Sequence, residues 1–137
     1  MSIQNDSRIK KYAIRNHRKM WKWIANKIDK AKPNTYFRGI DLVFEYLNTY
    51  FPDMGHICFC CEYASYMTSD QGIKCFYCPI LWGTESKYTS YYCEYGSGLY
   101  SNFMRLSELG NWKEAAKIAR EIANLPSKDE IEISKEE

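Results

Sequence analysis

Four cysteines in two C-x-x-C pairs are the residues of this chain best suited to chemistry. Cys58 and Cys61 form the first pair, Cys75 and Cys78 form the second, and thirteen residues separate the pairs. Two residues between thiols allow a tight turn to aim both sulfurs at one ion about 2.3 Å away. This spacing is typical of structural zinc sites. We predict one structural Zn²⁺ per chain bound by these four thiolates, in a closed site without a position for substrate.

The remaining donors leave alternatives open. Cys60 lies inside the first turn, where its side chain is expected to point away from Cys58 and Cys61 and to pack as a small apolar residue. Cys93 or His56 can take the place of one of the four ligands. The cysteines can also be reduced thiols of the core, or a redox pair.

A catalytic constellation is missing from the sequence. The two histidines, His17 and His56, are far apart, and no Gly-rich phosphate loop, H-E-x-x-H or G-x-S-x-G motif occurs. His17 falls near the apolar face of a helix and is expected to be a core histidine rather than a base. We predict no enzymatic activity, with a nuclease or nucleotide hydrolase as the alternative.

Helices must position these cysteines. The periodicity predicts a mainly α fold with a small irregular or β zinc-knuckle segment, in one compact zinc-stapled domain over 1–126. The strongest apolar stripes are those of the first and last helices, which are expected to pack together. The predicted elements are helices 6–31, about 36–50, about 99–109 and 112–124, the zinc segment 53–98, and an acidic flexible tail 127–137.

The first helix also carries a basic stripe. Residues 1–32 hold ten Lys and Arg against two Asp, whereas 127–137 hold five acidic residues against two Lys. A row of cations on one helix face can bind nucleic acid or an acidic protein surface, although it is also what a solvated face looks like. The candidate binding residues are Arg8, Lys11, Arg15, Arg18 and Lys22.

Composition points to a cytoplasmic protein. The N-terminus has no apolar run, and no stretch approaches the roughly 18 apolar residues that a membrane span requires. Clustered thiols in a reducing compartment more often hold metal than form disulfides. We therefore predict no membrane partner and a location in the cytoplasm.

Several motifs together resemble a known group of proteins. The resemblance rests on four motifs and on Cys93. The motifs are N-H-R-K-M-W-K-W-I-A at 16–25, C-F-C-C-E-Y-A at 58–64, C-F-Y-C-P-I-L-W-G at 75–83 and A-R-E-I-A-N-L-P at 119–126. The chain is similar to small four-cysteine zinc-binding proteins of tailed phages and prophages of Gram-positive bacteria.

That resemblance implies a context rather than an activity. A phage accessory protein is expected to act in the bacterial host cytoplasm by stoichiometric binding to a host protein, plausibly as an inhibitor of an antiviral defence effector. The alternative is a nucleic-acid-binding zinc protein that uses the basic first helix. Sequestration of a signalling nucleotide is a weaker possibility.

Overall fold

Five α-helices make up the part of the chain that the structure describes. The structure is a computed structural model, and the residues it describes are 3–30, 38–54, 58–67, 79–80 and 99–127. The helices are α1 (Ile3–Lys30), α2 (Gly39–Tyr50), α3 (Phe59–Met67), α4 (Leu99–Glu108) and α5 (Trp112–Ala123). Within these ranges no strand is formed, and the β structure is one antiparallel bridge between Ile80 and Ser127.

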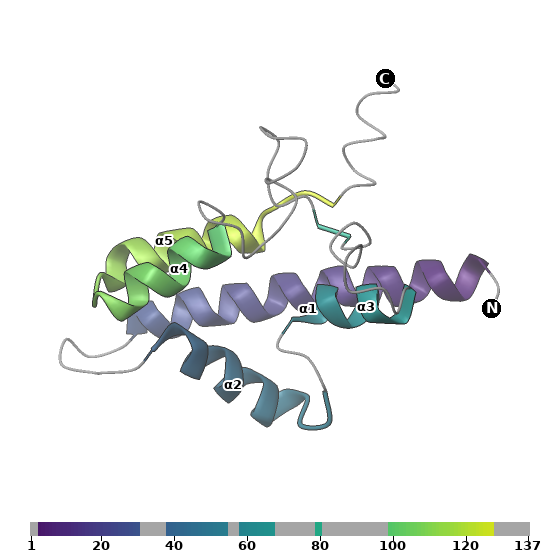
Figure 1. The fold of residues 1–137 in the computed structure, drawn as a ribbon, viewed down its shortest axis with the longest axis horizontal. Coiled ribbons are helices and arrows are strands. Elements are labelled where there is room, and N and C mark those ends of the chain that lie inside the picture. Colours follow the sequence, from purple (N-terminus) through teal and green to yellow (C-terminus); the bar gives the residue numbers. More distant parts are fainter. Residues whose placement is uncertain (1–2, 31–37, 55–57, 68–78, 81–98, 128–137) are drawn as a thin grey trace, which may run out of the picture.

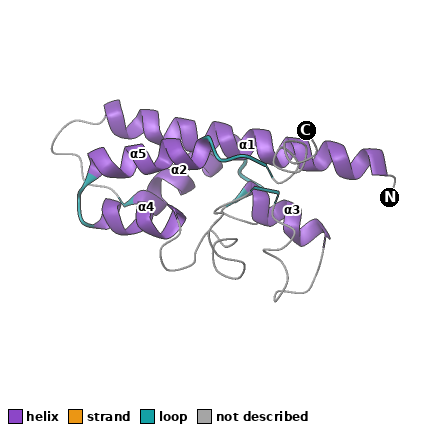
Figure 2. Ribbon diagram, turned by 90° about the horizontal axis from the view of Figure 1, so that it is seen from above, coloured by secondary structure: helices purple, strands orange, loops and turns teal. Residues whose placement is uncertain are grey.

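The long helix α1 is the axis around which the other helices are arranged. Figure 1 shows α2, α4 and α5 beside its C-terminal half and α3 beside its N-terminal half, and Figure 2 shows the same division from above. The most extensive packing is between α1 and α5, as their apolar stripes predict. The buried face of α5 is mostly alanine, which lets the two backbones approach closely.

The core is centred on Trp21 of α1. Its ring is 1% exposed and meets the edges of Phe103 at 5.1 Å and Tyr100 at 6.1 Å between centroids, both rings from α4. Near Phe103, α2 begins at Gly39, whose backbone N–H donates to Ser107 Oγ at 3.1 Å. Aromatic edge-to-face pairs of this kind add to the stabilisation that comes from apolar burial.

The mainly helical prediction is confirmed, and the four predicted helices are found within a few residues of their expected limits. The prediction of an irregular segment over 53–98 was wrong for 59–67, which form α3. Cys60 and Ala64 share the buried face of α3 with Phe59 and Tyr63, so the cysteine counts toward the apolar periodicity there. The sequence argument expected Cys60 to pack as a small apolar residue, but it placed the residue inside a tight turn between two ligands, and that obscured the helical pattern.

Much of the predicted zinc knuckle and of the acidic tail lies outside the described residues, at 68–78, 81–98 and 128–137. Among the described helices, none is both long and apolar enough to cross a membrane.

Candidate metal centre

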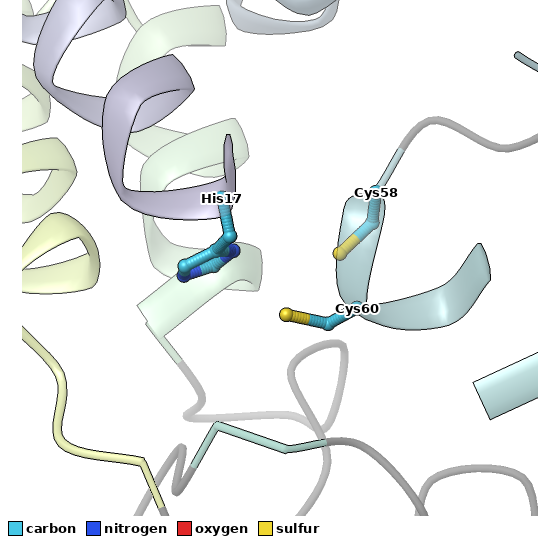
Figure 3. Close-up of side chains that lie close together, drawn as sticks. All are labelled: His17, Cys58 and Cys60. Carbon is cyan, nitrogen blue, oxygen red and sulfur yellow. The ribbon is translucent and has the colours of Figure 1, made fainter. Parts of the chain in front are cut away.

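Three metal-ligating side chains meet where α1 packs against α3. The donor atoms of His17, Cys58 and Cys60 all lie within 4.8 Å of one another. Figure 3 shows the side chain of His17 projecting from α1 and the sulfurs of Cys58 and Cys60 both pointing toward its imidazole ring. The cluster joins residues separated by about forty positions in the sequence, so only the packing of α3 on α1 brings them together.

The buried stripe of α1 positions His17. The residue lies one turn after Ala13 and one turn before Met20, both in the core, and is itself 0% exposed. Burial lowers the pKa of His17 from 6.5 to about 4, and the nearby backbone of Ile122 opposes part of that shift. The ring is therefore neutral near pH 7, which is the form that binds a metal ion.

The start of α3 positions the two cysteines. Cys58 directly precedes the helix, and its carbonyl accepts the first helical hydrogen bond from the Glu62 backbone N–H at 3.1 Å. Cys60 follows within the first turn, so both sulfurs lie at the positive end of the helix dipole. Backbone N–H groups at that end favour negatively charged ligands such as thiolates. Cys60 is 0% exposed and Cys58 is 9% exposed, so the site is enclosed.

The spacing of the donors fits a tetrahedral ion. Bonds of about 2.0 to 2.3 Å to nitrogen and sulfur place tetrahedral ligands roughly 3.5 to 3.8 Å apart. Donors within 4.8 Å of one another therefore need to move by about 1 Å at most to bind one ion. The described group supplies three donors, and a tetrahedral structural site uses four.

The four cysteines predicted as ligands have different outcomes. Cys58 belongs to the cluster, while Cys61 is half-buried in the first turn of α3 and lies close enough for its charge to raise the pKa of His17. Cys75 and Cys78 lie outside the described residues, as do His56 and Cys93.

Sequence reasoning missed His17 and Cys60 as donors. Cys60 is buried as expected, but its sulfur does not point away from Cys58: the two lie within 4.8 Å of each other and of His17. A signal for His17 was present, because it fills the gap between Ala13 and Met20 in the helical stripe. That pattern indicates burial, whereas the match to cysteines on another helix is a tertiary property.

An aromatic groove lies next to this cluster. It has a volume of about 750 Å³ and runs between α1, the end of α2 and α3. Phe59 and Tyr63 of α3 form part of its lining, and three tyrosines that also line it are exposed by 47%, 55% and 38% of their surface: Tyr12, Tyr50 and Tyr66. Single exposed aromatics are ordinary, but three around one apolar groove are typical of a binding surface.

The basic stripe of α1 lines a second groove, of about 510 Å³. Arg8 is exposed and does not line it. Arg18 is half-buried, and its Nη2 donates to the Leu125 carbonyl at 3.1 Å, which attaches the chain after α5 to α1. The predicted stripe residues found in this groove are Lys11, Arg15, Arg18 and Lys22, and Lys10 and Lys19 join them.

Comparison of the chain with protein families, with curated proteins and with solved structures found no match. The resemblance to phage and prophage proteins therefore stays a prediction from the sequence motifs.

Proposed function

We propose that this protein is a non-catalytic binding protein in which a structural zinc ion fastens α3 to α1. The observation that carries the proposal is the enclosed group of His17, Cys58 and Cys60, contributed by two helices that are far apart in the sequence. A fourth sulfur from the predicted pair Cys75 and Cys78 would complete the coordination.

The donor set supports zinc. One imidazole nitrogen and two or more thiolates suit Zn²⁺, whereas magnesium and calcium require oxygen ligands. Burial of all three donors supports a structural role, because a catalytic zinc ion keeps one position open to water or substrate. The expected consequence of metal binding is stability, since the free energy of metal binding in small zinc domains contributes directly to folding.

The aromatic groove supports a binding role. Its walls include α1 and α3, so an ion that joins these helices would also maintain the groove. Exposed tyrosines supply large contact areas at low entropic cost, and such residues often dominate the binding energy of protein interfaces. Asp53 and Glu62 also line the groove and are exposed. This combination suits an apolar protein segment flanked by basic residues.

The partner we propose is a host protein. The sequence resemblance to phage accessory proteins supports this class of partner, with an antiviral defence effector as the plausible target. Inhibition should then saturate near one equivalent of this protein per effector site, whereas a smaller amount of protein that consumes excess substrate would demonstrate turnover and end the proposal.

Metal analysis of single variants tests the zinc site. The purified protein should contain close to one equivalent of zinc, and Cys60→Ser should lose it together with thermal stability. Cys61→Ser is the matched control, because the two residues are neighbours in the same turn and the substitution is chemically identical. Loss of zinc in Cys61→Ser alone would instead support the set Cys58, Cys61, Cys75 and Cys78.

A second comparison tests the groove. Tyr12→Ala and Tyr66→Ala should each weaken host-protein binding by tenfold or more, on the order expected for interface hot spots. Phe44→Ala and Leu109→Ala are matched controls, because both residues are large, apolar and exposed but do not line the groove. Equal losses in all four variants would contradict a binding role for the groove.

A further inference from the structure

The basic groove along α1 is independent of the aromatic groove and of the metal centre. Among the residues that the structure describes, nine line it; six of these are Lys or Arg, and none is acidic. Four of these cations are exposed and have no ion-pair partner among the residues that the structure describes: Lys11, Arg15, Lys19 and Lys22.

These four cations lie on one face of α1. At about 100° per residue they fall within an arc of roughly 80° on the helix surface, and Lys11 and Lys22 are about 16 Å apart along the axis. Phosphates along one strand of a duplex recur every 3.4 Å of helix axis or so, which makes the span from Lys11 to Lys22 about as long as five base pairs. The half-buried Arg18 lies on the same face, and its hydrogen bond to the Leu125 carbonyl fixes the position of its guanidinium.

The lining also indicates which polyanion fits. Ile14 is the one apolar member among the described lining residues, so these residues supply none of the buried aromatic or aliphatic anchors that dominate protein interfaces. None of the described lining residues carries an aromatic ring on which the bases of a single strand would stack. What remains is a set of charges suited to a phosphate backbone, whose contacts fix position without reading sequence.

We propose that this groove binds the phosphate backbone of double-stranded nucleic acid without sequence specificity. Contacts from four cations predict a slope of about −3.6 in a plot of log K against log salt concentration. The affinity should therefore fall by roughly 150-fold between 50 mM and 200 mM salt.

Fluorescence anisotropy with a labelled 20-base-pair DNA duplex of arbitrary sequence and the full-length, zinc-loaded protein tests the proposal. The double variant Arg15→Ala, Lys22→Ala should reduce the slope by about 1.8, because two phosphate contacts are removed. The matched control is Lys113→Ala, Lys117→Ala, which removes the same charge from exposed positions of α5 outside the groove. The control should retain the wild-type slope.

Three results would overturn the proposal. Equal reductions of the slope in the two double variants would mean that net charge alone drives binding. Tighter binding of a single strand of the same length would contradict the selection of a duplex. Absence of duplex binding at 50 mM salt, both by the full chain and after removal of the acidic residues 128–137, would contradict binding by the groove.

Discussion

Gly39 offers a quantitative test of how α2 is joined to α4. A Cβ built at this position would lie 2.6 Å from Ser107 Oγ and 2.7 Å from Phe103 Cε1. Ordinary contacts of a Cβ begin at about 3.4 Å, so the phenyl ring would have to retreat by about 0.7 Å. Phe103 is 0% exposed and its ring meets Trp21 edge to face, so the ring has little room to move.

Overpacking of a rigid core by one methyl group costs about 1 to 3 kcal/mol. The hydrogen bond from the Gly39 N–H to Ser107 Oγ would be strained by the same displacement, which favours the upper half of that range. At about 4 °C per kcal/mol for a chain of this size, Gly39→Ala should lower the Tm by roughly 8 to 12 °C. Urea and thermal denaturation followed by circular dichroism measure this change.

Three companion variants make the test specific. Asn48→Ala, at an exposed position of the same helix, should change stability by less than about 0.5 kcal/mol. Ser107→Ala should cost about 1 to 3 kcal/mol, because it leaves the buried Gly39 N–H without its acceptor. The double variant Gly39→Ala, Ser107→Ala should lose less unfolding free energy than the two single variants lose together, because removal of Ser107 Oγ relieves one of the two close contacts of the new Cβ.

Zinc content separates this effect from the metal site. Gly39 lies at the contact between α2 and α4, whereas the candidate ligands lie on α1 and α3, so Gly39→Ala should retain its zinc. A Gly39→Ala protein as stable as the wild type would refute the close packing of Gly39 against Phe103 and Ser107.

Two further predictions concern a helix start and a buried ring. Titration by NMR should give Asp41 a pKa below 3.8, because the backbone N–H of Arg38 and then its guanidinium donate to the carboxylate. The stabilisation from these hydrogen bonds is present above the ordinary pKa of Asp41 and is lost as the pH falls through its lowered pKa. Arg38→Ala should bring the pKa only part of the way back to 3.8, because the backbone donor remains. A return of the pKa to 3.8 in this variant would show that the guanidinium, not the backbone N–H, causes the shift. Trp21→Ala should cost about 3 to 5 kcal/mol, while Trp23→Ala, which empties a half-buried position, should cost clearly less. Equal losses of unfolding free energy in the two tryptophan variants would contradict the central place of Trp21.

The sequence by itself determined most of the helices and the pairing of two of them. Periodicity at 3.6 residues is a local property, so the stripes of 6–31 and 112–124 could be recognised without a structure. Their mutual packing followed because each needed an apolar partner. The helix at 59–67 was missed because the first C-x-x-C pair was interpreted as a tight turn in an irregular metal-binding segment, although Cys60 was already expected to pack as an apolar residue.

The candidate metal centre depended on tertiary structure. The sequence spacing predicted Cys58 as a metal ligand, because two thiols of one turn are neighbours along the chain. It could not identify His17, whose nearest partners in the cluster are about forty residues away and are brought to it by the packing of α3 on α1. The pairing of distant donors is decided by which helix faces meet, and that depends on the side chains of the whole core rather than on any local pattern.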